Sequence, residues 1–315
     1  MFFPQFQHRF TVVALFCPLL FGFPAQAQQT VAVRKNAKNI TARLLQKAIR
    51  TGMAGRSGAA LVVEVESSKI IARQGMQTAA RRVVTPGSTV KPFVLMALLR
   101  SQKLKSDDVF FCRRTLRIAG KRMDCTHPEL AAPLHAEEAL AYSCNSYFAA
   151  MAERISAAEL ASEFHRAGFA SPTGWAPNEA TGTVKETQTP EQRQLQALGE
   201  EAVKITPLEL LAAYRSLALK LQSGDKTWDV IYHGLQDSAT YGMAHGAAPQ
   251  GYNVAGKTGT ANSSASALTH GWFAGYAPAE KPEIALVVYL EHGRGSDAAA
   301  VAQTIFAAYG RVKGR

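Results

Sequence analysis

Segments with the composition of β-strands lie near both ends of this chain of 315 residues, and a long region with helical patterning separates them. Residues 58–66 (GAALVVEVE) form a β-branched run, and residues 69–73 follow after Ser67-Ser68, so we expect a β-hairpin. Further strands, separated by turn residues, are predicted over 252–261, 271–276 and 283–291. Strands at both ends with helices between them imply one sheet built from N- and C-terminal segments.

The middle of the chain, roughly residues 127–221, is predicted to be mostly helical. Thr206-Pro207-Leu208-Glu209 combines an N-cap residue, a proline at the first helical position and a capping-box glutamate. Other helices are predicted over 39–51, 88–104 and 296–309. Residues 171–189, rich in Pro, Gly and Thr, are expected to form a long surface loop.

The expected fold class is therefore α+β: an antiparallel sheet flanked by helices, with an inserted, mainly helical lobe. The sheet lobe is expected to comprise about residues 55–84 and 250–315, and the helical lobe about residues 85–249. Ligands usually bind where such lobes meet, so a cleft is expected at their seam.

The first 27 residues have the pattern of a secretory signal peptide. Arg9 precedes an apolar stretch over residues 10–23, and Ala25-Gln26-Ala27 offers a small-residue cleavage site. A helix of that apolar length extends about 21 Å, less than the ~30 Å hydrocarbon core of a bilayer. We expect cleavage after Ala27, a periplasmic or otherwise extracytoplasmic location, and a single domain over 28–315. An uncleaved membrane anchor is the alternative.

The chain is basic, with 35 Lys and Arg against 24 Asp and Glu and a formal net charge of +11. In an exported protein this charge favours anionic lipid or cell-wall surfaces, although a solvated basic surface is the simpler interpretation. Nucleic acid is not an expected partner, because the sequence lacks zinc-ligand spacing, an aromatic RNA-binding signature and a long basic run.

Three of the four cysteines, Cys112, Cys125 and Cys144, lie beyond the signal peptide. In an oxidising compartment, one pair and one leftover thiol are expected. Cys112 and Cys125 bracket a segment with Gly120 near its middle, and a hairpin there would bring them together in a disulfide. Such a bond would stabilise the fold by roughly 3 kcal/mol on the chain-entropy account. Two unpaired thiols are the alternative.

Three short motifs occur in order along the chain. They are Ser88-Thr89-Val90-Lys91 at the start of a predicted helix, Ser143-Cys144-Asn145 in the helical middle, and Lys257-Thr258-Gly259-Thr260 on a predicted strand. A serine hydroxyl is a poor nucleophile until a base takes its proton. Positions i and i+3 of a helix share a face, so Lys91 can reach Ser88. Lys91 acts as a base only if burial, or a nearby positive charge such as Lys257, lowers its pKa.

The three motifs together resemble those of the transpeptidase domain of penicillin-binding proteins, within the serine β-lactamase/D,D-peptidase superfamily. The likeness covers roughly residues 55–310 and includes the residues around each motif, Thr206–Leu210 and His270–Pro278. It implies a β-lactamase/transpeptidase-like fold and serine acyl transfer that needs no metal or organic cofactor.

The resemblance also implies catalytic roles. Ser88 would be the nucleophile, Lys91 its base, and Ser143 a proton relay to the leaving amine. A serine at a helix start places its backbone N–H toward a developing oxyanion. By resemblance, the second oxyanion donor is the backbone N–H of Thr260.

Substrate-binding roles follow from the same resemblance. Asn145 would hydrogen-bond the substrate's side amide, since it offers both a donor and an acceptor. Lys257, Thr258 and Thr260 would bind the free carboxylate of a D-Ala-D-Ala terminus or of a β-lactam. Gly259 would let the substrate backbone approach the strand closely.

A metal site is not expected, because no two histidines beyond the signal peptide are spaced four apart on a predicted helix. Cys144, which lacks a nearby histidine in the sequence, is expected to be a buried thiol and not a nucleophile. The chain contains no G-x-S-x-G motif, which argues against an α/β-hydrolase.

The sequence therefore predicts a serine D,D-transpeptidase or D,D-carboxypeptidase that acts on D-Ala-D-Ala ends of peptidoglycan and binds penicillin covalently. Expected partners are peptidoglycan stem peptides, β-lactam antibiotics and other cell-wall synthesis proteins. One alternative is a serine β-lactamase with Glu179 as its deacylation base, although the Asn that normally follows that glutamate is missing. The other alternative is a non-catalytic binding or scaffold protein of the cell envelope.

Overall fold

The computed structural model describes residues 1–2, 25–105, 108–262 and 268–314. The chain divides into two compact units, residues 1–40 and residues 41–315. The helix α1 (Ala25–Gly52) begins in the first unit and ends in the second. Most of the predicted signal peptide lies outside the described residues, so its cleavage stays a prediction, as does the 28–315 domain boundary. Within the described part of the chain, no helix is long and apolar enough to cross a bilayer.

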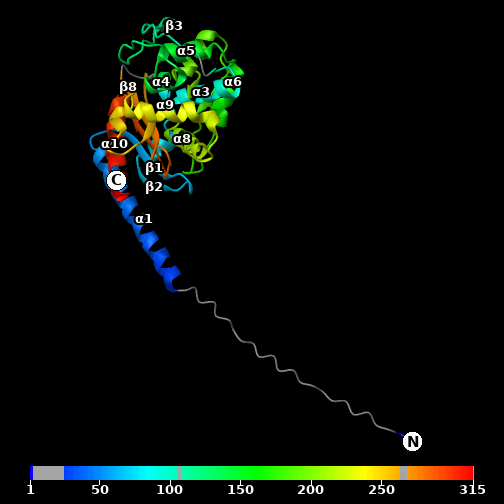
Figure 1. Ribbon diagram of the computed structural model, residues 1–315, viewed down its shortest axis with the longest axis vertical. Helices are drawn as coiled ribbons and strands as arrows, with labels where there is room; N and C mark the ends of the chain where they lie inside the picture. Colours follow the sequence, from blue (N-terminus) through cyan, green and yellow to red (C-terminus); the bar gives the residue numbers. More distant parts are fainter. Residues whose placement is uncertain (3–24, 106–107, 263–267, 315) are drawn as a thin grey trace. The chain divides into compact units, whose positions relative to one another are not determined.

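The second unit is built on an antiparallel sheet with the strand order β2-β1-β9-β8-β7 (Figure 1). Its strands are β1 (Gly58–Glu64), β2 (Ile70–Gln74), β7 (Ala255–Asn262), β8 (Thr269–Ala277) and β9 (Ile284–Leu290). β1 and β2 form the predicted hairpin, and β1 also pairs with β9 along its whole length. The predicted single sheet from both ends of the chain is thus confirmed.

Both faces of this sheet are buried. Side chains alternate between the two faces along a strand, so neighbouring residues enter different cores. Leu61 and Val287 belong to the core beneath the helical lobe, whereas Val62 and Val288 belong to the core on the opposite face. All four are fully buried. Burial of a side chain of this size contributes about 1.5–3 kcal/mol, which explains why these strands read as continuous apolar runs.

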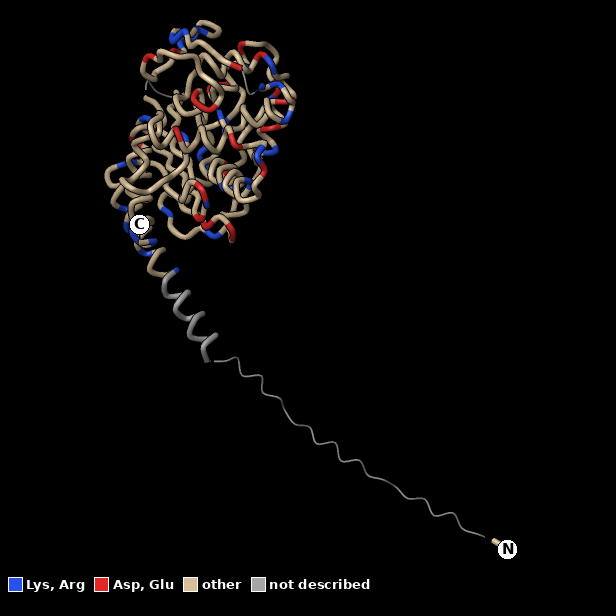
Figure 2. Tube along the Cα trace, viewed as in Figure 1, with Lys and Arg blue, Asp and Glu red and all other residues tan. Residues whose placement is uncertain are grey.

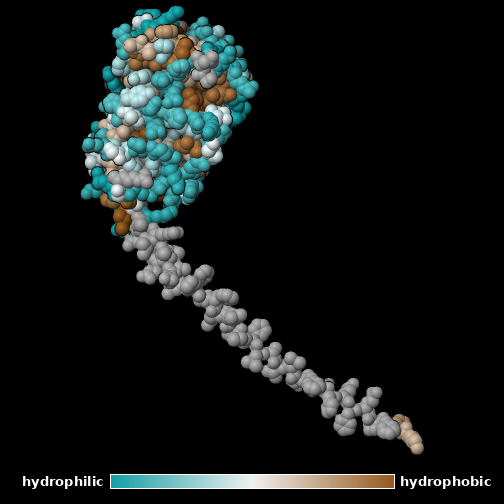
Figure 3. Space-filling view, in the orientation of Figure 1, coloured by the Kyte–Doolittle hydropathy of each residue, from teal (hydrophilic) through white to brown (hydrophobic). Residues whose placement is uncertain are grey.

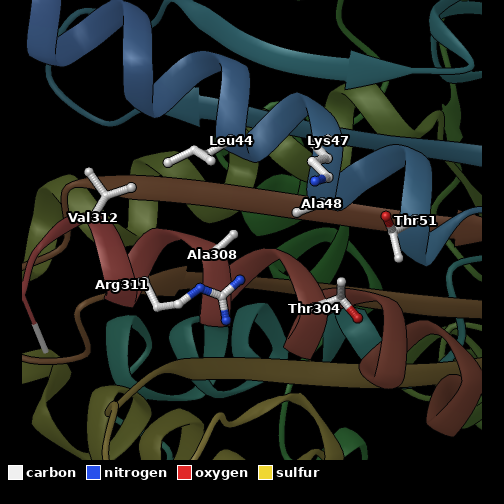
Figure 4. A pocket seen from close by; sticks show the side chains of 8 residues that line it. All are labelled: Leu44, Lys47, Ala48, Thr51, Thr304, Ala308, Arg311 and Val312. Atoms are coloured by element: carbon white, nitrogen blue, oxygen red, sulfur yellow. The ribbon is translucent and has the colours of Figure 1, made fainter.

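One face of the sheet is covered by α10 (Gly295–Val312) and by the last turns of α1. Leu45 and Ile49 of α1 and Phe306 of α10 are buried in this core. Figure 4 shows a groove between the two helices, with side chains from each helix along its sides. The groove has a volume of about 430 Å³, and no residue of the three sequence motifs lines it.

The other face is covered by α2 (Met76–Arg81) and α8 (Pro207–Gln222). Behind them the helical lobe contains α3 (Lys91–Arg100), α4 (Ala136–Ala141), α5 (Asn145–Ala152), α6 (Ala157–Arg166), α7 (Pro190–Ala197) and α9 (Asp229–Thr240). The predicted capping box at the start of α8 is confirmed, because Thr206 and Glu209 each accept the other's backbone N–H.

Short elements connect these helices. They are the 3₁₀-helices η1 (Gly87–Val90), η2 (Lys226–Trp228) and η3 (His245–Ala247), and the strand pairs β3 (Arg117–Ile118) with β4 (Lys121–Arg122) and β5 (Thr183–Val184) with β6 (Val203–Lys204). The helix predicted over 88–104 starts as η1 and ends at Arg100. It ends there because Gln102 has a φ of 56°, a left-handed conformation that an α-helix cannot include.

Charged residues of both signs are spread along the chain of the second unit (Figure 2). Basic residues gather around the β3–β4 hairpin, which carries Arg113, Arg114, Arg117, Lys121 and Arg122. The face seen in Figure 3 is mostly hydrophilic, with hydrophobic residues in small separate areas. The buried hydrophobic residues form two cores, one on each face of the sheet.

Candidate active site

Ser88 stands in a tight turn that leads into a helix, since η1 is followed directly by α3. Thr89 Oγ1 donates to Pro86 O at 2.9 Å, and Tyr214 Oη donates to Thr89 O at 2.9 Å, so the turn is held from two sides. The Ser88 side chain is half-buried and forms no hydrogen bond with any described residue. Its hydroxyl is therefore available to a ligand.

The third motif lies against this turn, backbone to backbone. A Cβ added at Gly87, which has a φ of 55°, would lie 2.9 Å from Thr260 O. A Cβ added at Gly259 would lie 2.7 Å from Pro86 O. On this side of Gly259 the space is filled by the turn that carries Ser88, and the approach of a substrate backbone to Gly259 stays a prediction. The two glycines are thus what allows the first and third motifs to meet.

Lys91 is fully buried and is held by the second motif. Its Nζ donates to Ser143 O at 2.8 Å, to Ser143 Oγ at 3.2 Å and to Asn145 Oδ1 at 2.6 Å, and it lies 5.1 Å from the centre of the Phe148 ring. Burial lowers the pKa of Lys91 to about 8. No hydrogen bond joins Lys91 to Ser88 in the described residues, so the predicted proton transfer stays a prediction. The two side chains nevertheless start from the same helical turn.

The second motif forms the turn between α4 and α5. Ser143 has a φ of 55°, a conformation that non-glycine residues rarely adopt and that costs of order 1–3 kcal/mol. In this conformation both its carbonyl oxygen and its hydroxyl accept from Lys91. Asn145 Nδ2 donates to Met123 O at 3.1 Å and to Asp124 O at 3.3 Å. The side chain of Asn145 therefore positions Lys91, and its binding of a substrate amide stays a prediction.

Lys257 is also fully buried, and its Nζ donates to Thr258 O at 3.2 Å. Burial, and then the positive charge of Lys91, hold the pKa of Lys257 well below its ordinary value. The charge of Lys91 thus disfavours protonation of Lys257. An effect of Lys257 on the pKa of Lys91 stays a prediction.

The two threonines of the third motif differ in exposure. Thr258 is buried and its Oγ1 donates to Met243 O at 3.2 Å. Thr260 is exposed, and its Oγ1 accepts from Gly295 N at 2.9 Å. Gly295 starts α10, so the third motif is tied to the helix behind the sheet. Carboxylate binding by these threonines stays a prediction.

Glu200 is a residue of this region that sequence analysis missed. It follows Gly199, whose carbonyl oxygen accepts from Gly87 N at 3.0 Å, so Glu200 lies beside the turn that carries Ser88. Burial raises the pKa of Glu200. A hydrogen bond from Asn262 Nδ2 at 3.3 Å and the positive charges of Lys121 and Lys91 act to lower this pKa, but burial has the larger effect. No motif contains Glu200, and tertiary contacts bring it here: the bond between Gly87 and Gly199 and the bond from Asn262.

Glu179, the deacylation base of the β-lactamase alternative, is engaged in its own loop. Its carboxylate accepts from the backbone N–H groups of Thr173, Gly174 and Ala176, and from Thr173 Oγ1. Burial acts to raise the pKa of Glu179, but these backbone bonds lower it overall. A carboxylate with these contacts organises the loop, and its role as a deacylation base stays a hypothesis.

The expected disulfide needs correction. Cys112 and Cys125 are free thiols with 3.5 Å between their Sγ atoms, longer than the ~2.05 Å of a disulfide bond, so the predicted disulfide is not formed in this structure. Cys144 is buried as expected, but it is not isolated from histidine. Cys112, Cys125, His127 and Cys144 form one cluster that could hold a metal ion. The expected absence of a metal site, which was inferred from histidine spacing on helices, stays a prediction.

The fold and this geometry define a class of protein: α+β domains in which a buried lysine stands one helical turn after a serine, beside a strand at the edge of the sheet. Residues 58–309 match the family described as the penicillin binding protein transpeptidase domain. The chain therefore belongs to that family.

Curated relatives share the sequence of this region. Peptidoglycan D,D-transpeptidase MrdA of Acinetobacter baumannii is 26% identical over 224 residues, covering 54% of this chain and 33% of the relative. Stage V sporulation protein D of Bacillus subtilis is 26% identical over 250 residues, covering 67% of this chain and 38% of the relative. The chain thus spans about a third of the length of the curated relatives it matches.

Solved structures share the fold. The D,D-transpeptidase domain of a peptidoglycan glycosyltransferase from Eggerthella lenta superposes with a TM-score of 0.76 at 21% identity, covering 86% of this chain and 82% of that one. PBP2 of Pseudomonas aeruginosa in complex with WCK 5153 gives 0.74 at 22% identity, covering 84% and 76%. Helicobacter pylori PBP2, solved in complex with MreC, gives 0.75 at 18% identity, covering 86% and 63%. These likenesses confirm the predicted transpeptidase-like α+β fold.

Proposed function

We propose that this chain is a serine D,D-transpeptidase or D,D-carboxypeptidase that acts on the D-Ala-D-Ala ends of peptidoglycan stem peptides. The same site would be acylated by penicillin. The single observation that carries the proposal is the environment of Lys91: fully buried, with a pKa lowered to about 8, and held by Ser143 and Asn145 one turn from Ser88. Such a lysine is available as a neutral base near physiological pH.

Acylation begins when Lys91 Nζ takes the proton of Ser88 Oγ. The oxygen then bonds to the carbonyl carbon of the penultimate D-Ala, and the backbone N–H groups of Ser88 and Thr260 stabilise the oxyanion. The C–N bond to the terminal D-Ala breaks as the proton passes from Lys91 through Ser143 Oγ to the leaving amine. The distance of 3.2 Å between Lys91 Nζ and Ser143 Oγ supports this relay.

The acyl-enzyme is released when an amine from a second stem peptide, or water, attacks the same carbonyl carbon. The amine gives a cross-link and water gives a shortened peptide. With a β-lactam, the ring nitrogen stays attached to the acyl group, so release depends on activating water. The engagement of Glu179 in its own loop supports a long-lived adduct and weighs against the β-lactamase alternative.

Intact-mass spectrometry of the full chain after mixing with benzylpenicillin tests the proposal. We expect a stoichiometric adduct that persists for minutes or longer, and release of D-Ala from a synthetic stem pentapeptide. Ser88→Ala should abolish both, whereas Ser101→Ala, at the far end of the same helix, should not. Rapid hydrolysis of penicillin would indicate a β-lactamase. A folded protein without an adduct would indicate a non-catalytic scaffold.

We also propose that the chain acts outside the cytoplasm and works beside other cell-wall synthesis proteins. The apolar stretch and the Ala25-Gln26-Ala27 site support export, and the Helicobacter pylori PBP2–MreC complex supports a protein partner. N-terminal sequencing of protein from the cell envelope should begin at Gln28. A chain that still carries residues 1–23 would instead show an anchor.

A further inference from the structure

The β3–β4 hairpin is a strongly basic element beside the second motif. Residues 109–123, which contain the hairpin, carry five arginines and lysines and no acidic residue. The turn between the strands consists of Ala119 and Gly120, whose φ angles of 47° and 79° are both positive. Two positive φ angles are typical of the tight turn that closes a two-residue hairpin loop. The hairpin is therefore a defined element whose two faces can be assigned.

The two faces of the hairpin differ in burial and charge. Ile118 and Met123 are buried in the core of the helical lobe. Because side chains alternate along a strand, their neighbours Arg117 and Arg122 lie on the other face. The backbone pairing continues toward Arg113, which is therefore on the same side as Arg117. All three arginines are exposed, and together they form what we call the outer face of the hairpin.

The positive charge of the outer face is only partly compensated. Arg122 forms an ion pair with Asp124, although the Arg122 side chain is 76% exposed. The side chains of Arg113 and Arg117 form no ion pair or hydrogen bond within the described part of the chain. Arg117 also lies directly opposite Arg122 in the antiparallel pair, a position in which like charges destabilise a hairpin. An anion bound across these two arginines would offset their repulsion.

The hairpin is fixed beside the candidate active site from two sides. Asn145, which accepts a hydrogen bond from Lys91, donates from its Nδ2 to Met123 O at 3.1 Å. On the other side, Lys121 Nζ lies 3.0 Å from Glu201 Oε2, in the segment that contacts the turn of the serine nucleophile. The outer face therefore begins one residue away from a group that bonds to the side chain holding the lysine base.

A stem peptide bound at Ser88 is long enough to reach this face. Five extended residues span up to about 17 Å, and D-Ala-D-Ala accounts for only the last two of them. The residues ahead of D-Ala-D-Ala include a glutamyl residue with a free carboxylate. Arginine binds carboxylates through a planar fork of donors, which suits it to this group. The outer face thus matches a part of the substrate that the three motifs leave unbound.

We propose that Arg113, Arg117 and Arg122 bind the carboxylates of the stem peptide that acylates Ser88. The chain would then prefer stem peptides with free carboxylates to those in which the carboxylates are amidated. This inference rests on the proposed function and adds a specificity determinant to it. The arginines act on substrate binding and take no part in the acyl transfer itself. Because they are exposed, their attraction for the peptide is screened by salt.

Two synthetic pentapeptides that differ only in whether the glutamyl carboxylate is free or amidated test the proposal. The release of D-Ala from each gives kcat/KM, and the ratio of the two values measures the preference. At low ionic strength we expect the wild type to favour the free carboxylate by roughly two- to five-fold, the size of one exposed ion pair, mainly through KM. In about 1 M salt the ratio should fall toward one. Equal kcat/KM values at low ionic strength would overturn the proposal.

Variants of the outer face locate the preference. Arg117→Gln should bring the ratio toward one without lowering thermal stability, because it removes the repulsion between Arg117 and Arg122. Arg117→Glu should reverse the preference. Arg43→Gln is the matched control, since Arg43 is exposed on α1, which covers the opposite face of the sheet. The ratio compares two substrates of one variant, so a general loss of activity cancels. An unchanged ratio after replacement of all three arginines of the outer face by Gln would overturn the assignment.

Binding without turnover separates this inference from the proposed function. Fluorescence anisotropy of the two labelled peptides with the Ser88→Ala variant measures their affinities. Weaker binding of the amidated peptide, with no D-Ala release and no benzylpenicillin adduct in the wild type, would refute the function and leave the outer face standing. D-Ala release at equal rates from both peptides would keep the function and overturn the inference. Equal peptide affinities together with binding to phosphatidylglycerol vesicles that Arg117→Gln removes would identify a lipid-binding surface instead.

Discussion

Lys91 Nζ donates a hydrogen bond of 2.6 Å to Asn145 Oδ1, which joins the first sequence motif to the second. The amide oxygen is neutral, so it holds the lysine in place without the full negative charge that would raise its pKa. The pair therefore combines two requirements of a lysine base: a fixed position and a low proton affinity.

Asn145→Asp should move the pH dependence of acylation to higher pH. A carboxylate at this distance favours the charged lysine, so the pKa of Lys91 should rise by about 1–3 units. The rate of acylation by benzylpenicillin, measured from pH 6 to 10, should then reach half of its maximum at a higher pH than in the wild type. Asn145→Ala is the control, because it removes the hydrogen bond but adds no charge. An unshifted midpoint in Asn145→Asp would show that Asn145 does not act on Lys91.

The wild-type acylation rate should itself rise with pH through a midpoint near 8. Below the pKa of Lys91, which burial lowers to about 8, the lysine is protonated and cannot accept the serine proton. Above it the neutral amine predominates and the rate levels off. Lys91→Ala should lower the rate by about 10²–10⁴-fold and flatten this limb of the profile. A wild-type profile that is flat from pH 6 to 10 would contradict the role of Lys91 as the base.

Glu200→Gln should move the same midpoint to lower pH by a fraction of a unit. The Glu200 carboxylate acts to raise the pKa of Lys91, whereas burial lowers it. Without the carboxylate, burial should lower the pKa of Lys91 further. Glu201→Gln is the matched control, because Glu201 forms an ion pair of 3.0 Å with Lys121 on a more exposed part of the surface. Equal profiles for the two variants would show that Glu200 is electrostatically remote from Lys91.

Gly259→Ala should destabilise the fold by about 1–3 kcal/mol, the usual cost of forcing a methyl group into a packed site. The added Cβ would lie 2.7 Å from Pro86 O and 2.9 Å from Thr89 Cγ2, so β7 or the serine turn must move. Acylation of Ser88 should slow as a result. Gly246→Ala is the control, since the nearest neighbour of its added Cβ would be Ala299 Cβ at 3.9 Å. Chemical denaturation of the two variants measures the difference, and equal midpoints would contradict the packing argument.

Glu179→Ala should leave the lifetime of the penicillin adduct unchanged while lowering stability by about 1–3 kcal/mol. The loss of stability is expected because Glu179 accepts hydrogen bonds from Thr173, Gly174 and Ala176, which would lose their partner. Time-resolved intact-mass spectra give the lifetime, and thermal unfolding gives the stability. A markedly longer adduct lifetime in the variant would restore Glu179 as a deacylation base.

The sequence by itself determined the local features of this protein. The hairpin of β1 and β2 follows from alternating β-branched residues around a turn, and the start of α8 follows from Thr206 and Glu209 three residues apart. Ser88 and Lys91 lie on one helical turn for the same reason, because an i, i+3 relationship needs only the local backbone. These interactions act over a few residues, so residue order is enough to predict them.

Only the tertiary structure decided which distant groups meet. Glu200 lies near Ser88 because Gly199 contacts Gly87, and three cysteines and a histidine converge although 32 positions separate Cys112 from Cys144. Asn145 contacts Lys91. An asparagine side chain can bond to many kinds of partner, so its residue type alone could not predict this contact. Each of these contacts depends on how whole elements pack against one another. That packing is set by the summed burial of two cores, which no short sequence pattern records.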